Sequence, residues 1–279
     1  MSGSLESISW TRSGHLAGVE VLSGFADARP WRWFHETYSF CAAEAAASNW
    51  RYRRGEYFLN DGSVMLLEPG ETHRNIVVHK PADFKVLLVS ADAFGELTRE
   101  LGAPTTAHFS SAQVDRADLF ALIWRLCLAI EAGASPLAQQ GLLTQVVARL
   151  AAHAERRPPP PSGVEEPRAI ARAKAYLEHR CRDAVSLDEL AEVAGLTRFR
   201  LAQAFTRAVG LPPHAWQILV RIERSRELLA QGMSAAAAAS ESGFCDQAHF
   251  SRHFRRIMRV TPGDYRRGAR AAPALRSTP

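Results

Sequence analysis

The sequence predicts an α+β chain, in which a β-barrel and a helical hairpin are followed by an all-helical domain. Three observations lead to this fold class. The first 110 residues have short apolar or alternating runs broken by turn residues, as at 60–62 (Asn-Asp-Gly) and 69–70 (Pro-Gly), which is typical of a barrel or sandwich. From about residue 115, apolar residues recur at helical spacing. Four prolines at 158–161 then favour an extended spacer.

Length and composition are those of an ordinary two-domain globular protein. The chain has 279 residues, of which 47% are hydrophobic and 23% charged, enough for two separate cores. It contains no apolar run of the roughly 18 residues that a membrane helix needs, and no signal-peptide pattern. Its four cysteines are scattered without metal-ligand spacing. We therefore expect a cytoplasmic protein without cofactor, zinc finger or membrane contact.

Positive charge is concentrated in the C-terminal part. The chain carries a net charge of +5 and has a pI near 9.3. Residues 167–270 contain 18 Lys and Arg against 10 Asp and Glu, so the rest of the chain is net negative. A basic domain permits a nucleic acid or an acidic surface as its partner.

Within the predicted barrel, several aromatic and polar side chains could form a binding site for a small molecule. These residues are Trp33, His35, Tyr38, Arg51 and His73. Aromatic walls with a few polar groups are the usual build of a small-ligand pocket. Aromatic residues at strand spacing also fill barrel cores, and His73 could equally be a histidine hydrogen-bonded at the barrel end, so both interpretations stay open.

A metal site in the barrel is not expected. The stretch from Gly62 through Gly70 to His73 resembles the second motif of the cupin barrel. Metal-dependent cupins use this histidine together with ligands from an earlier His-x-His stretch. Here the corresponding stretch reads His35-Glu36-Thr37, so a second histidine is missing, whereas a redox metal needs three or four ligands in fixed geometry.

Residues 111–155 are predicted to form a helical hairpin. One apolar stripe runs from Leu119 to Ile130 and a second from Leu142 to Leu150, with a Gly-Ala-Ser-Pro break at 133–136. Such a pair can cover the barrel or present an apolar seam to a second subunit. We expect mainly the former, with homodimerisation as the sharper hypothesis.

After a Pro-rich linker at residues 156–166, the helical domain at 167–270 repeats one pattern. Each copy has a helix-capping residue, a short helix, a glycine that ends it, and a second capping residue before another helix. The matching pairs are Ser186 and Ser234, Gly195 and Gly243, and Thr197 and Asp246. The repeat predicts two helix-turn-helix motifs, which we call the first motif (about 187–208) and the second motif (about 235–258).

One long helix, roughly His214 to Gln231, is predicted between the motifs, because it follows two prolines and ends at Gly232. A helix of about 18 residues is about 27 Å long, and successive major-groove faces of DNA lie about 34 Å apart. A rod of this length could hold the two motifs over adjacent turns of DNA.

The second helix of each motif combines an apolar face with a polar or basic face. In the second motif Phe250, Phe254 and Ile257 recur at helical spacing, as in a helix packed on a core. The opposite face has small side chains, which allow close approach to a groove, and Gln and Arg, which donate to base edges. One solvated amphipathic helix would look the same, but the repeat favours DNA binding.

The region 169–267 resembles the two-motif DNA-binding domain of the AraC/XylS family of bacterial transcription regulators. The residues that carry the resemblance are Gly243-Phe244, His249-Phe250-Ser251-Arg252, Phe254, Val260-Thr261-Pro262-Gly263 and Tyr265-Arg266. Residues 53–75 resemble, less specifically, the cupin-like effector domain of many members. The resemblance implies binding to double-stranded promoter DNA as a dimer or monomer, often a response to a small molecule, and contact with RNA polymerase in an activator.

Carried over residue by residue, the resemblance implies DNA contacts from both motifs. Groove contacts are expected from Arg198, Phe199, Ala202 and Gln203 in the first motif and from Gln247, Ala248, Ser251 and Arg252 in the second. Phosphate contacts are expected from Arg200, His249, Arg255 and Arg256. The polyalanine stretch at 235–239 departs from the family pattern of larger aliphatic residues, so we expect looser packing there.

The sequence thus predicts a non-enzymatic regulator. Its expected parts are a cupin-like effector domain at 1–110, a hairpin at 111–155, a linker at 156–166, a DNA-binding domain at 167–270 and a disordered tail at 271–279. Two alternatives stay open, namely a metal-dependent cupin enzyme fused to a DNA-binding domain, and a regulator whose barrel only mediates protein contacts.

Overall fold

The computed structural model describes residues 8–26, 32–44, 47–53, 55–156 and 165–270. The chain divides into two compact units, Met1–Arg157 with Arg267–Pro279, and Pro158–Arg266. We call them the N-terminal and the C-terminal unit and describe each by itself. Residues 157–164 of the predicted linker and the tail predicted at 271–279 lie outside the described residues. Among the described helices, none is long and apolar enough to cross a membrane.

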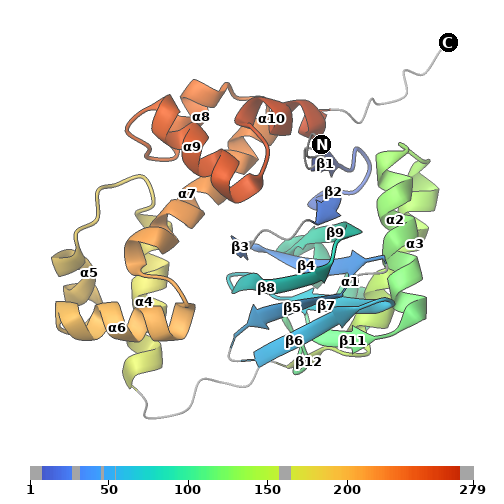
Figure 1. Cartoon of the computed structure of the whole chain (residues 1–279), viewed down its shortest axis with the longest axis horizontal. Helices are drawn as coiled ribbons and strands as arrows, with labels where there is room; N and C mark the ends of the chain where they lie inside the picture. Colours follow the sequence, from blue (N-terminus) through green and yellow to red (C-terminus); the bar gives the residue numbers. More distant parts are fainter. Residues whose placement is uncertain (1–7, 27–31, 45–46, 54, 157–164, 271–279) are drawn as a thin grey trace. The chain divides into compact units, whose positions relative to one another are not determined.

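Two antiparallel sheets form the body of the N-terminal unit (Figure 1). The larger sheet has the strand order β1-β2-β9-β4-β7-β11 and the smaller β3-β8-β5-β6, while β10 pairs with β12. The strands are β1 Ser9–Arg12, β2 Val19–Ala26, β3 Arg32–Phe34, β4 Thr37–Ala43, β5 Ala47–Tyr52, β6 Gly55–Asn60, β7 Ser63–Leu67, β8 Thr72–Lys80, β9 Ala82–Ser90, β10 Ala107–His108, β11 Gln113–Asp115 and β12 Glu155–Arg156. The predicted β-rich domain is confirmed.

Helices α2 (Ala117–Glu131) and α3 (Pro136–Ala151) cover one face of the six-stranded sheet (Figure 1). Their apolar stripes share one core with every second residue of the sheet, such as Tyr38, Phe40 and Ala42 of β4, because successive strand residues point to opposite faces. The predicted hairpin is confirmed, and its apolar stripes pack on the sheet of this same chain.

Two elements of this unit were not predicted. Helix α1 (Ala91–Glu100) begins directly after β9, where the Ser90 hydroxyl accepts a hydrogen bond from the Ala93 amide at 3.2 Å. Strand β11 pairs with β7 inside the stretch predicted as hairpin. Strand β11 has only three residues, too few for a periodic pattern, and α1 follows β9 without any intervening turn residue.

The C-terminal unit is helical (Figure 1). Its helices are α4 Glu165–His179, α5 Leu187–Ala194, α6 Arg198–Val209, α7 Pro213–Ala230, α8 Ala235–Glu241, α9 Gln247–Met258 and α10 Pro262–Arg270. Residues 165 and 166, predicted to belong to the linker, form the first turn of α4, where acidic side chains favour a helix N-terminus. Likewise Arg156 belongs to β12. The predicted pair of motifs joined by a long helix is confirmed.

Helix α7 is the centre of the C-terminal unit. Its Trp216 is fully buried and meets Phe205 of α6 edge to face at 6.4 Å, while the Lys174 ammonium lies 4.4 Å from its ring centroid. Further along α7, Arg226 and Glu223 form a buried ion pair, and Arg226 also donates to the Tyr265 hydroxyl of α10 at 3.3 Å. Helix α7 also contacts α8 and α9, so both motifs pack on one helix.

Candidate functional site

The first motif consists of α5 and α6. Capping side chains and a left-handed glycine fix the turn between the two helices. The Ser186 hydroxyl accepts a hydrogen bond from the Glu189 amide at 3.1 Å, and the Glu189 side chain accepts one from the Ser186 amide. Gly195 ends α5 in the left-handed region, at φ 68°. Thr197 then caps α6 by accepting from the Arg200 amide at 3.4 Å. These are the capping roles predicted for Ser186, Gly195 and Thr197.

Helix α6 buries one face and exposes the other. Its inward residues are Leu201, Ala204 and Phe205. The outward residues include those predicted to contact DNA: Arg198, Phe199, Arg200 and Gln203 are exposed, and Ala202 is half-buried. Phe199 exposes 72% of its surface, so its ring is free to meet a partner. Arg198 is held by Asp188, with 3.0 Å between its Nε and the carboxylate.

The second motif, α8 and α9, repeats this arrangement. Ser234 caps α8 by accepting from the Ala237 amide at 3.2 Å, Gly243 follows at φ 80°, and Asp246 caps α9 by accepting from the His249 amide at 2.6 Å. The inward residues of α9 are Phe250, Phe254, Ile257 and Met258. Of the residues predicted to contact DNA, Gln247, Ala248, Arg252, Arg255 and Arg256 are exposed, while His249 and Ser251 are half-buried.

His249 is more constrained than the other predicted contact residues. Its ring Nδ1 lies 3.3 Å from the Cys245 sulfur, and its ring packs at 4.6 Å against His253. Burial lowers the pKa of His253 to about 4, so this imidazole is neutral and its Nδ1 lies 3.1 Å from the Arg256 guanidinium. His249 would have to leave its contact with Cys245 to reach a phosphate.

A junction between the motifs was not anticipated from the sequence. It consists of Arg221 on α7, residues 181–183 after α4, and Gly243-Phe244 in the second turn. The guanidinium of Arg221 donates to the carbonyls of Cys181 at 2.6 Å and Asp183 at 2.8 Å, and lies 6.0 Å from the Phe244 ring. A side chain at Gly243 would start 2.5 Å from the Arg182 carbonyl oxygen. The main chain therefore passes this turn too closely for any residue but glycine.

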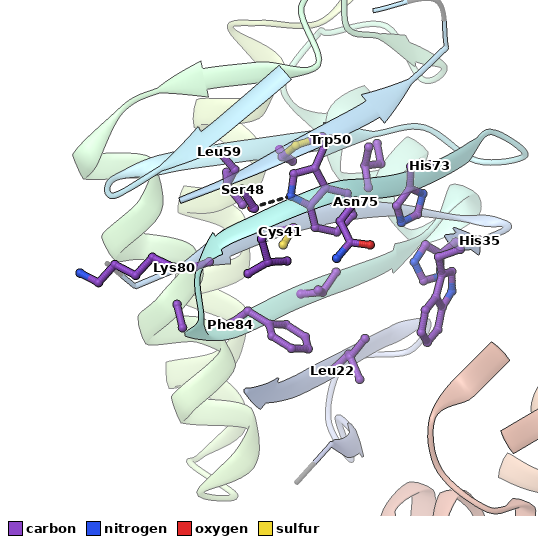
Figure 2. Close-up of a pocket in the computed structure, with 17 residues that line it drawn as sticks. Leu22, His35, Cys41, Ser48, Trp50, Leu59, His73, Asn75, Lys80 and Phe84 are labelled. Atoms are coloured by element: carbon purple, nitrogen blue, oxygen red, sulfur yellow. Dashed lines mark hydrogen bonds between the residues drawn. The ribbon is translucent and has the colours of Figure 1, made fainter. Parts of the chain in front are cut away.

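A cavity of about 50 Å³ lies in the N-terminal unit between the two sheets (Figure 2). Residues from both sheets line it, and they include Trp33, His35 and His73, three of the five residues predicted to bind an effector. All three side chains are buried. Their rings stack, with 5.1 Å between the Trp33 and His35 centroids and 5.4 Å between His35 and His73.

The other two predicted effector residues lie outside this pocket, because they point to the opposite faces of their strands. On β4, Cys41 and Ala43 face the pocket, whereas Tyr38 faces α1 and packs 4.4 Å from the Phe94 ring. On β5, Trp50 faces the pocket, whereas Arg51 is exposed and pairs with Glu56. Ser48 and Asn75, which the sequence reasoning missed, do line the pocket.

The pocket has the electrostatics of an uncharged site. Burial lowers the pKa of His73 to about 3 and raises that of the Cys41 thiol to about 12, so both are neutral near pH 7. Among the described residues of the lining, Lys80 is the one lysine, arginine, aspartate or glutamate, and Figure 2 shows its side-chain nitrogen directed away from the other labelled residues. His35 and His73 stack ring on ring, and among the described residues no three His, Cys, Asp or Glu side chains could together hold a metal ion.

Comparisons with known proteins match both units. The family described as an AraC-like ligand binding domain matches residues 23–147, and the helix-turn-helix domain family matches residues 190–268. The chain is 25% identical to the uncharacterized HTH-type transcriptional regulator YbfI of Bacillus subtilis, over 77% of this chain and 79% of YbfI. It is 33% identical to GbdR of Pseudomonas aeruginosa, but this match covers 34% of the chain and only 26% of GbdR.

The fold of the whole chain also has a solved counterpart. ToxT from Vibrio cholerae superposes with a TM-score of 0.55 over 91% of this chain and 99% of ToxT, at 12% sequence identity. This likeness concerns the fold alone. Since the two family matches fall on the unit with the pocket and on the unit with the duplicated motif, the chain belongs to the AraC-type transcription regulators, with an N-terminal ligand-binding domain and a C-terminal helix-turn-helix DNA-binding domain.

Proposed function

We propose that the protein recognises a promoter sequence through the outward faces of α6 and α9, under the control of a small molecule bound between the two sheets. The observation that carries this proposal is the duplicated motif, in which each second helix is capped, buried on one side and lined on the other by exposed polar or basic residues. The surplus of basic residues in the same region supports binding to the phosphate backbone.

The proposed contacts divide into two classes. Arg198, Phe199, Ala202 and Gln203 of α6, and Gln247, Ala248, Ser251 and Arg252 of α9, are assigned to the groove. Arg200, His249, Arg255 and Arg256 are assigned to phosphates. Arginine and glutamine donate in pairs to guanine and adenine edges, and an aromatic ring can contact a thymine methyl. Phosphate contacts position the protein without reading sequence.

DNA binding is tested by footprinting the full-length protein on the upstream region of its own gene and on genomic fragments. We expect protected sites, and an affinity for them that falls linearly with salt on logarithmic scales as counterions are released. Equal affinity for the protected sequence and for scrambled DNA of the same length would exclude sequence-specific recognition. Transcription with purified RNA polymerase then shows whether the protein acts as an activator.

The effector role of the pocket is supported by its buried aromatic and neutral polar lining. ToxT has been solved with an unsaturated fatty acid bound, so a small, largely apolar ligand has a precedent in a protein of this fold. A regulator whose barrel only mediates protein contacts would instead show no stabilisation by any metabolite. Metal analysis of the purified protein tests the enzyme alternative, for which the stacked His35 and His73 offer no ligand set.

A homodimer is proposed on narrower grounds. The apolar stripes of α2 and α3 are buried within this chain, so they are not free to pair with a second copy. Leu128 and Leu137 remain 47% and 79% exposed on the same two helices. We expect light scattering to give the dimer mass, and Leu128→Glu with Leu137→Glu to give the monomer mass. A wild-type monomer at micromolar concentration would exclude this interface.

A further inference from the structure

The pocket contains a row of aromatic rings. From Trp33 the row passes to His35 at 5.1 Å, to His73 at 5.4 Å and to Trp50 at 6.0 Å, with interplanar angles between 24° and 32°. The row is built by strand pairing, because Trp33 lies opposite His73 between β3 and β8, and Trp50 lies opposite Asn75 between β5 and β8. Nearly parallel rings of this kind favour a flat aromatic partner in an offset stack.

Two buried histidines, His35 and His73, lie at one end of the pocket. Figure 2 shows the side chains of His35 and His73 at one side of the pocket, with that of Asn75 between them and Cys41. The Nδ1 atom of buried His73 makes no hydrogen bond of normal geometry among the described residues, and the nearby Glu71 backbone only partly offsets the effect of burial on the pKa of this imidazole. The indole N–H of Trp50, in contrast, already donates to the Ser48 hydroxyl at 2.8 Å. A ligand can therefore satisfy a polar atom that the protein leaves open at this end.

Charge excludes an ionised ligand from this end of the pocket. Among the described residues that line the pocket none is acidic, and burial lowers the pKa of His73 to about 3, so that its imidazole is neutral near pH 7. The ammonium of Lys80 is exposed and directed away from this ring. An ion buried without a partner of opposite charge loses several kcal/mol of hydration. Among the described lining residues, none beside His73 offers a carboxylate a lysine or arginine partner.

We propose that the effector is an uncharged, flat aromatic molecule that stacks on the ring row and places one hydrogen-bonding group against His73 and Asn75. This inference rests on the proposed function of the pocket. Because the cavity of about 50 Å³ is smaller than the roughly 150 Å³ that accommodates benzene, a side chain must yield on binding. Trp50 is half-buried, whereas the other three rings of the row are buried. We therefore expect the Trp50 side chain to move when the ligand binds.

The test compares benzamide with benzoate, which have the same shape and differ in charge. Each is titrated into the full-length protein by calorimetry, and decanoate is titrated as a third probe, a fatty carboxylate. We expect benzamide to bind at least about tenfold more tightly than benzoate, the factor that about 1.4 kcal/mol represents. His73→Phe keeps the ring and removes the open nitrogen, so it should weaken benzamide about tenfold. His79→Phe on the same strand is the matched control, because His79 is exposed and bonded to Asn49.

The pH dependence gives an independent readout. With a His73 pKa near 3, the imidazole stays neutral from pH 5 to 8, and benzamide affinity should not change across that range. Benzoate or decanoate binding as tightly as benzamide would overturn the ligand class while leaving the pocket as an effector site. Absence of benzamide binding also overturns the proposed ligand class. Footprinting of the same samples shows separately whether the DNA-binding function holds.

Discussion

The two helix-turn-helix motifs share their backbone framework and differ in almost every side chain that fills it. Both have a serine cap, a left-handed glycine between the helices and a second helix of 12 residues. Both second helices end in a left-handed residue, Gly210 in the first motif and Arg259 in the second. Caps and turns therefore define the motif, while most residues packed inside the two copies differ.

The two motifs differ in which helix contributes the large buried side chains. Helix α5 buries Leu190, whereas the equivalent position of α8 is Ala238, which is completely buried. The second motif compensates with a chain of aromatic rings, in which Phe250 lies 5.2 Å from Phe244 and 5.3 Å from Phe254. The looser packing expected for the polyalanine helix is thus opposed by aromatic side chains that contact each other nearby.

The outward faces differ as well. At equivalent positions α6 has Arg198 and Gln203, where α9 has Gln247 and Arg252, so the amide and the guanidinium exchange places along the helix. Phe199 corresponds to Ala248. Two motifs of one backbone would therefore present different donor patterns to DNA, as an asymmetric site requires.

The largest difference should appear at the two turn glycines. Gly243→Ala forces a left-handed alanine and a clash with the Arg182 backbone at 2.5 Å, which together should cost about 4 kcal/mol. At Gly195 the same change meets only the tip of Arg172 at 3.5 Å and should cost about 1 kcal/mol. Scanning calorimetry of the full-length protein measures both. Equal losses would contradict the close approach at the junction.

The next largest stability losses are expected at the buried positions of α5 and α8. Leu190→Ala should cost about 3 kcal/mol through loss of apolar contact and the cavity left behind. Ala238→Leu, its counterpart, should cost about 2 kcal/mol, because no space remains for the larger side chain. Denaturant unfolding of the two variants checks the signs. A stabilising Ala238→Leu would show that α8 is underpacked, as the sequence led us to expect.

Substitutions in the two outward faces should reduce DNA affinity by amounts that differ less between the motifs. Arg252→Ala is expected to lose about 2 kcal/mol of affinity for the footprinted site and to relax base preference there. Gln203→Ala should lose about 1 kcal/mol and leave the salt dependence unchanged, since no charge is removed. Fluorescence anisotropy on specific and scrambled duplexes distinguishes them. Arg224→Ala, an exposed arginine on α7, is the charge-matched control, and a loss of specificity there equal to that of Arg252→Ala would contradict the groove assignment.

Acid should weaken the second motif alone, by the smallest amount. The folded pKa of His253 is about 4, below its ordinary value of 6.5, because of burial and nearby Arg256. As pH falls below 6.5 the unfolded chain takes up the proton first, so stability declines until the folded pKa is reached. The first motif has Ala204 at the equivalent position. Between pH 7 and 5 we expect His253→Ala to lose about 2 °C less in Tm than the wild type, and an identical decline in both would exclude this histidine as the cause.

Elements with long periodic patterns or strong caps could be predicted from the sequence. The motifs, the long helix and the hairpin belong to this class, because each capping serine or glycine has a local physical role. Tyr38 and Arg51, predicted to bind an effector, do not line this pocket, although a β-rich domain was foreseen. Alternation along β4 and β5 puts both on the face opposite to Cys41 and Trp50.

Other features depend on contacts that no local pattern encodes. On β8 an extra residue, Ile76, separates Asn75 from Val77 in the pairing with β5. This extra residue shifts the alternation of side chains between the two faces of β8. Val78 and Lys80 therefore line the pocket on the same side as His73. The hydrogen bonds of Arg221 to residues 181–183, which lie 38 to 40 positions earlier in the sequence, are equally invisible before the helices are packed.

The chemistry of that junction bears on how the two motifs can evolve. Arg221 holds main-chain carbonyls of residues 181–183, and Gly243 is confined by main-chain atoms of Arg182. A substitution of Asp183 therefore leaves this main-chain attachment in place, whereas a substitution of Arg182 also removes an ion pair with Glu241 of α8, at 3.0 Å. Side chains on the outward faces of α6 and α9 can therefore change without disturbing the junction, which depends on Arg221, Gly243 and the Arg182–Glu241 ion pair.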